Sequence, residues 1–157
     1  MNAFFKTSIG RAPRSPRKPV AVVTTGRFAL DHQARPEADR IVLSLPMPPS
    51  TNNLFANSSH GGRFKTEEYD AWLTEAGWRI QAQKPGRIVG PYSIEINVSR
   101  PHTKRRMDLA NREKAISDLL VKHHVIADDS LCERLTMAWT PPGEGVLVTL
   151  TRAGAHS

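Results

Sequence analysis

The stretch KRRMDLANREKAISDLLVKHHVIADDS, Lys104–Ser130, combines a basic run, a helical pattern and a pair of adjacent carboxylates. Apolar side chains at Ile116, Leu119 and Leu120 fall within about 100° of one another on a helix, which predicts a buried stripe. A polar sector lies roughly opposite, and its members are Asn111, Lys114, Asp118 and Lys122. The stretch therefore predicts a helix from about Leu109 to His123 with one buried face and one polar face.

Carboxylates stand at both ends of this expected helix. Asp108 precedes it, and Asp128 and Asp129 follow it after a short extended piece that has room to fold them back beside the polar face. Clustered carboxylates repel one another unless a cation compensates, and Mg²⁺ binds oxygen ligands, typically one or two protein carboxylates with waters and phosphate. Such an ion activates water and stabilises charge on a scissile phosphate. A lysine beside it, here Lys114, can contact the phosphate or stabilise the leaving oxygen.

The same residues also have a purely structural interpretation, which their spacing leaves open. Asp108 could act only as a helix cap, and Asp128-Asp129 could form a polar turn before a strand. Lys114 and Asp118 could be an ordinary i,i+4 ion pair, worth a few tenths of a kcal/mol. The spacing alone does not decide between a metal-dependent nuclease and a solvated helix.

The remaining pattern predicts an α+β domain. Strands are expected at Ile41–Leu45, Tyr92–Ser99, Leu131–Trp139 and Gly145–Arg152. Thr66 is a plausible N-cap for a second helix, which Pro85-Gly86 should end. The segment from Pro46 to this helix is expected to be a loop with Gly61-Gly62 at its tip. The resulting order, β-α-β-α-β-β, predicts a mixed sheet with two helices.

Composition favours one basic domain behind an arm. The 157 residues include 22 basic and 15 acidic side chains, a formal net charge of +7. The first forty residues hold eight basic and three acidic side chains, so +5 of that charge lies there. Residues 1–40 are rich in Pro and Arg and are expected to be disordered, with a brief strand at Val20–Thr24; residues 41–157 form the domain. Excess cations suit a polyanion such as nucleic acid.

Several classes of protein are disfavoured by the sequence. The single cysteine, Cys132, excludes an intramolecular disulfide framework and a multi-thiolate zinc site, and it is expected to be buried and inert. No run approaches the ~18 consecutive apolar residues of a membrane span. The start of the chain lacks the apolar core of a secretory signal. These observations favour a cytoplasmic protein.

Two motifs give the chain a specific resemblance. The first is LPMPPSTNN, Leu45–Asn53. The second is a basic run followed by DLAN, then Lys114, Asp118 and the Asp-Asp pair. With these elements in order at matching separations, the chain resembles the RusA family of Holliday junction resolvases from about Ile41 to Arg152. The resemblance implies a homodimeric, Mg²⁺-dependent endonuclease, with Mn²⁺ as a substitute metal, that nicks four-way DNA junctions in recombination and repair. It also implies a bacterial or phage source.

The resemblance also implies a role for each matching residue. Asp108 and Asp129 would be catalytic metal ligands with Asp128 in close support, and Lys114 would be the catalytic lysine. Asn111 and Asp118 would support the site. Among the basic residues, those expected to contact the neighbouring backbone phosphates are Arg100, Lys104, Arg105 and Arg106. Asn52 and Asn53 are expected either to orient the loop near the site or to contact phosphate. Phe55 and Phe64 are candidates to wedge into an opened junction.

Two positions depart from the family pattern. Ala110 stands where the motif usually has a second, catalytic Asp, and Met107 stands where another cation is expected. The site could bind metal with extra waters, another polar group such as Asn111 could substitute, or the protein could bind branched DNA and cut weakly. Activity is the leading hypothesis. The alternatives are a catalytically weakened branched-DNA-binding protein and a basic interaction protein that reuses the fold.

Overall fold

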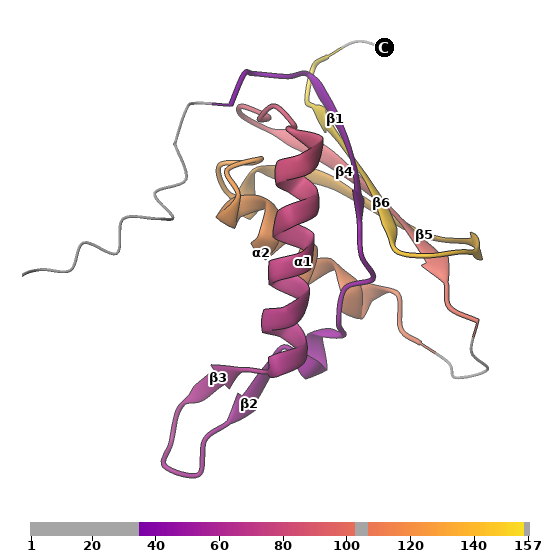
Figure 1. Ribbon diagram of the computed structural model, residues 1–157. Helices are drawn as coiled ribbons and strands as arrows, with labels where there is room; N and C mark the ends of the chain where they lie inside the picture. Colours follow the sequence, from indigo (N-terminus) through magenta and orange to yellow (C-terminus); the bar gives the residue numbers. More distant parts are fainter. Residues whose placement is uncertain (1–34, 103–106, 156–157) are drawn as a thin grey trace, which may run out of the picture. The chain divides into compact units, whose positions relative to one another are not determined.

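A four-stranded mixed sheet forms the centre of the domain (Figure 1). The computed structural model describes residues 35–102 and 107–155. Strand order is β1-β6-β4-β5, with β1 antiparallel to β6, β6 antiparallel to β4, and β4 parallel to β5. The strands are β1 Arg40–Leu45, β4 Tyr92–Arg100, β5 Cys132–Pro142 and β6 Val146–Arg152. The predicted α+β class with a mixed sheet and two helices is confirmed.

Alternating apolar residues give the sheet its buried face. Ile41, Leu43 and Leu45 are buried on β1 while the residues between them are exposed. Their partners on β6 are buried in the same way, and the paired residues Ile94, Ile96 and Val98 of β4 continue that face. Residues at every second position point to one side of a strand, so this face and the apolar stripes of the helices form one core.

The first helix, α1, spans Glu67–Gln83 and begins as the sequence predicts. The Thr66 hydroxyl accepts a hydrogen bond from the backbone N–H of Tyr69 at 3.2 Å, which is the N-cap interaction. The helix ends at Lys84, whose φ of 46° lies in the left-handed region. Apolar residues at helical spacing form its buried face; they are Tyr69, Trp72, Leu73, Ala76 and Ile80.

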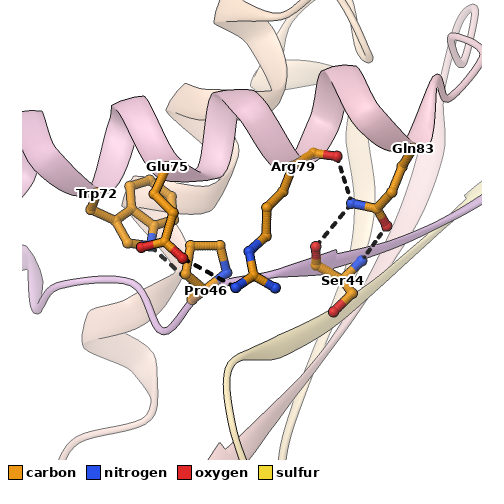
Figure 2. Close-up of polar contacts among 6 residues, drawn as sticks. All are labelled: Ser44, Pro46, Trp72, Glu75, Arg79 and Gln83. Atoms are coloured by element: carbon orange, nitrogen blue, oxygen red, sulfur yellow. Dashed lines mark hydrogen bonds and ion pairs between the residues drawn. The ribbon is translucent and has the colours of Figure 1, made fainter.

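Two side chains of α1 form hydrogen bonds with the backbone of the edge strand β1 and of the residue after it (Figure 2). The Gln83 amide accepts a hydrogen bond from the Ser44 N–H at 2.8 Å and donates to the Ser44 carbonyl at 3.0 Å. The Trp72 indole N–H donates to the Pro46 carbonyl at 3.1 Å. Gln83 thus satisfies backbone groups that an edge strand otherwise leaves open to another chain. Both contacts fix where the loop after β1 begins.

That loop contains a hairpin that the sequence analysis did not predict. Strands β2, Phe55–Asn57, and β3, Arg63–Lys65, pair antiparallel. Gly61 and Gly62 lie in the connection with φ of 88° and 92°, a conformation that L-residues with side chains rarely adopt. All three residues of β3 are exposed, so no apolar alternation marked it as a strand.

The second helix, α2, spans Glu113–Lys122, with the short 3₁₀ turns η2, Ala110–Arg112, before it and η3, Asp129–Leu131, after it. The helix is shorter than the Leu109–His123 predicted because its first turn is 3₁₀. Most of the expected arm, residues 1–34 with the strand expected at Val20–Thr24, lies outside the described residues. Across the part of the chain that is described, no helix is long and apolar enough to cross a membrane.

Candidate active site

The two sequence motifs meet in space. Thr51 begins the 3₁₀ turn η1, Thr51–Asn53, and its hydroxyl donates to the backbone carbonyl of Asn111 in η2 at 3.0 Å. The buried Arg112 guanidinium donates to the Pro48 carbonyl. These contacts join segments about sixty residues apart in the chain, so the PMPPSTNN loop and the DLAN segment form one surface.

Asp108 is exposed, and its carboxylate is oriented by two hydrogen bonds from the residues that follow it. One oxygen accepts the backbone N–H of Ala110 at 3.1 Å, and the other accepts the Asn111 side-chain amide at 2.9 Å. Asn111 therefore orients Asp108. The Ala110 side chain is exposed and contributes no oxygen at the position where the family motif usually has a carboxylate.

Lys114 and Asp118 lie one turn apart on the exposed side of α2. The Lys114 ammonium donates to the Asp118 carboxylate at 3.0 Å. This hydrogen bond raises the pKa of Lys114, burial partly opposes it, and the charges of Asp118, Asp129 and Glu113 add to the rise. Lys114 is therefore positively charged at neutral pH. Burial, and then the charges of Asp118 and Asp70, raise the pKa of Tyr69 on α1 to about 12.

The Asp-Asp pair opens η3, which packs against α2. Asp128 caps this turn, because its carboxylate accepts the Ser130 backbone N–H at 2.8 Å. Hydrogen bonds from the Ser130 hydroxyl and then from its N–H lower the pKa of Asp128. Asp129 is exposed and close enough for its charge to act on Lys114. Lys114 thus forms a hydrogen bond with Asp118 and interacts with the charge of Asp129 without a direct contact.

The sequence pattern singles out neither Tyr92 nor Glu113, two residues near these carboxylates. Tyr92 is fully buried at the start of β4 and pairs in register with Cys132 of β5. Burial raises the Tyr92 pKa, and the charges of Cys132, Asp129 and Glu113 raise it further. Glu113 accepts a hydrogen bond from the Ser117 hydroxyl. Its position directly before Lys114, in the first helical turn, was the available signal.

The carboxylates suit Mg²⁺ in their chemistry but form no closed cage. Asp108, Asp128 and Asp129 present hard oxygen ligands at the surface. Within residues 35–102 and 107–155, no group of three or more His, Cys, Asp and Glu side chains is arranged to hold a metal ion. Mg²⁺ commonly keeps several waters and binds through one or two protein carboxylates. The donor set therefore fits a water-rich shell and not a site of three protein carboxylates.

The expected DNA-binding residues divide into three groups. Asn52 and Asn53 are exposed in η1, directly beside the segment that carries Asp108 and Asn111. Arg100 is exposed at the end of β4, with its guanidinium carbon 5.7 Å from the centre of the Trp139 ring. The expected contacts at Lys104, Arg105 and Arg106 lie outside the described residues.

One family model matches the sequence of the chain. It is described as Endodeoxyribonuclease RusA and covers residues 46–151, which include the first motif from Pro46 onward, the whole second motif and every element from α1 to β5. No curated protein matches the chain in sequence.

Proposed function

This chain belongs to the family of RusA endodeoxyribonucleases, which are Holliday junction-resolving nucleases, and we propose that it resolves four-way DNA junctions itself by paired, Mg²⁺-dependent nicks in DNA recombination and repair. The observation that carries the proposal is the contact between the two motifs, Arg112 with Pro48 and Thr51 with Asn111. The η1 turn with Asn52 and Asn53 contacts η2, which follows Asp108, and the charge of Asp129 acts on Lys114. Both observations support the proposal.

The residues of the chain then take distinct roles. Asp108, fixed by Asn111, and Asp129, with Asp128 beside it, are the carboxylates that we assign to hold the metal. Lys114 stays protonated and would stabilise negative charge on the phosphate or the leaving oxygen. Asp118 would position the Lys114 ammonium through its 3.0 Å ion pair. Mg²⁺, or Mn²⁺ in its place, would supply Lewis-acid activation of water when bound.

A symmetric homodimer is part of the proposal. A four-way junction has two-fold symmetry, and paired nicks need two equivalent sites, which a C2 dimer provides. Because this function needs no membrane and acts on DNA, we assign the protein to the cytoplasm of a bacterium or a phage-infected cell.

Glu113 is the carboxylate best placed to compensate for Ala110. Residues three apart in a 3₁₀ helix lie above one another, so Glu113 projects over the same side as Ala110. Its charge acts on Lys114, as that of Asp129 does. Asn111, the substitute closest to Ala110 in sequence, already uses its amide to hold Asp108.

The test is nicking of a synthetic mobile four-way junction with and without Mg²⁺. We expect wild type to nick only with Mg²⁺, and Asp129→Asn to bind the junction with unchanged affinity but not nick it. Unchanged nicking by Asp129→Asn removes Asp129 from the mechanism. Equal affinity of wild type for the junction and for linear duplex at moderate salt would instead indicate a basic protein that reuses the fold.

The second candidate function is a branched-DNA-binding protein with a weakened catalytic site, which Ala110 favours. The substitution Ala110→Asp separates it from the first. A large gain in nicking would support the weakened site, whereas robust wild-type nicking without a gain would support compensation by Glu113.

A further inference from the structure

The β2–β3 hairpin carries cations and an aromatic ring that the site above does not use. Its sequence, FANSSHGGRFK from Phe55 to Lys65, contains no acidic residue. Acidic side chains begin only at Glu67, in the first turn of α1. Figure 1 shows the hairpin extending beyond the N-terminal end of α1, away from the four-stranded sheet.

The root of the hairpin is fixed to the domain. Leu54, just before β2, is buried, and its carbonyl accepts the Thr66 N–H at 3.1 Å. The Thr66 hydroxyl donates to the Asn53 carbonyl at 2.6 Å. The Phe55 ring packs edge-on against Tyr69 with 5.8 Å between centroids. Since η1 at this root also bonds to Asn111, the hairpin emerges directly from the candidate active site.

One face of the hairpin holds two cations over aromatic rings. The Arg63 guanidinium carbon lies 5.3 Å from the Phe55 centroid, and the Lys65 ammonium lies 5.8 Å from the Tyr69 centroid. Such cation–π contacts orient the side chains while leaving their charge accessible. Arg63 and Lys65 are both exposed, so either can bind an anion.

The opposite face presents a single large apolar group. Phe64 pairs across the hairpin with Ala56 and is 54% exposed. Adjacent strand residues point to opposite faces, so Phe64 points away from the cations on either side of it. One ring beside an alanine is too small an apolar patch for a stable protein interface, which needs roughly 800 Å² from each partner. An exposed ring on one face of a short strand, with cations on the other face, suits stacking on a base while the cations bind nearby phosphates.

We propose that the β2–β3 hairpin is a second DNA-contacting element, which inserts Phe64 at the branch point of a four-way junction. Arg63 and Lys65 bind the flanking phosphates. The inference rests on the proposed function and extends it: the hairpin opens the base pairs at the crossing, while the carboxylates act on the backbone. Apolar side chains that wedge between bases unstack them.

The test uses a four-way junction with 2-aminopurine at the branch point, whose fluorescence rises when its neighbours unstack. Full-length wild type, Phe64→Ala, Arg63→Gln and the control Trp78→Ala are compared; Trp78 is 62% exposed, on the same helix as Tyr69. Phe64→Ala should lose most of the fluorescence increase yet bind the junction within about 5-fold of wild type, because unstacking and stacking largely offset. Arg63→Gln should weaken binding and reduce its salt dependence by about one counterion.

The outcomes distinguish failure of the hairpin inference from failure of the proposed function. Trp78→Ala should behave as wild type in both measurements. If Phe64→Ala binds and raises the fluorescence as wild type does, the hairpin inference is overturned and the proposed function stands. If wild type shows no preference for the junction over duplex, the proposed function fails and the inference fails with it.

Discussion

Replacing Arg112 with Met tests whether the hydrogen bond between Arg112 and the Pro48 carbonyl keeps the two motifs together. The guanidinium donates to the Pro48 carbonyl and is nearly inaccessible to solvent. A hydrogen bond to a charged group contributes about 1.5–3 kcal/mol. The Arg112 Nε is also buried with no hydrogen-bond partner among the described residues, and removing that group returns about 1 kcal/mol. Methionine preserves much of the apolar stem, so the net loss should be about 0.5–2 kcal/mol.

A loss of that size lowers Tm by roughly 1–8 °C for a chain of this length. Thermal and urea unfolding of Arg112→Met should show it, and nicking should fall because the Asn52-Asn53 turn is no longer held beside Asp108. The control is Arg79→Met, which removes an exposed i,i+4 pair with Glu75 and should change stability by less than about 0.5 kcal/mol. If Arg112→Met and Arg79→Met have equal stability and nick at equal rates, the claim that the contact between Arg112 and Pro48 holds the two motifs together is refuted.

Three further changes test other parts of the account. Glu113→Gln should reduce Mg²⁺-dependent nicking at least about 10-fold if Glu113 compensates for Ala110, and an unaffected rate would exclude it. Gly77→Ala, which normally stabilises a helix by about 1 kcal/mol, should not do so here, because the new methyl would lie 2.9 Å from the His123 Nε2; urea unfolding of Gly77→Ala with and without His123→Ala measures the clash. Burial, and then neighbouring positive charges, lower the pKa of His123 in the folded protein. As the pH falls, the imidazole of the unfolded chain therefore becomes protonated before that of the folded protein, and stability should decrease below about pH 6.5. Urea midpoints from pH 8 to pH 5 should show a smaller fall for His123→Asn, and identical slopes would contradict the assignment.

The sequence predicts those parts of the fold that periodicity encodes. Alternation along Ile41–Leu45 and Tyr92–Ser99 corresponds to strands with one buried face, and the Thr66 cap begins α1 as expected. The polar sector of α2 also appears as predicted, with Lys114 paired to Asp118. In each case the signal is local, because a few neighbouring residues determine which side is buried.

The sequence does not predict contacts that depend on distant segments. The β2–β3 hairpin has too few residues and too little burial to show alternation. The donation from Arg112 to Pro48 joins positions 64 apart, and nothing near Arg112 marks it as a buried cation. Glu113 reads as an ordinary first-turn acid, and only the folded structure brings its charge near Tyr92 at the start of β4.

The central claim is that Asp108 and Asp129 hold one divalent ion beside Lys114, and Mn²⁺ titration followed by electron paramagnetic resonance tests it most directly. The account predicts that Asp108→Asn and Asp129→Asn each weaken the same Mn²⁺ site at least about 10-fold, that the double variant is little worse than either, and that Asp70→Asn on α1 binds as wild type. Unchanged Mn²⁺ binding in both single variants, or independent losses that add in the double variant, would contradict a shared ion.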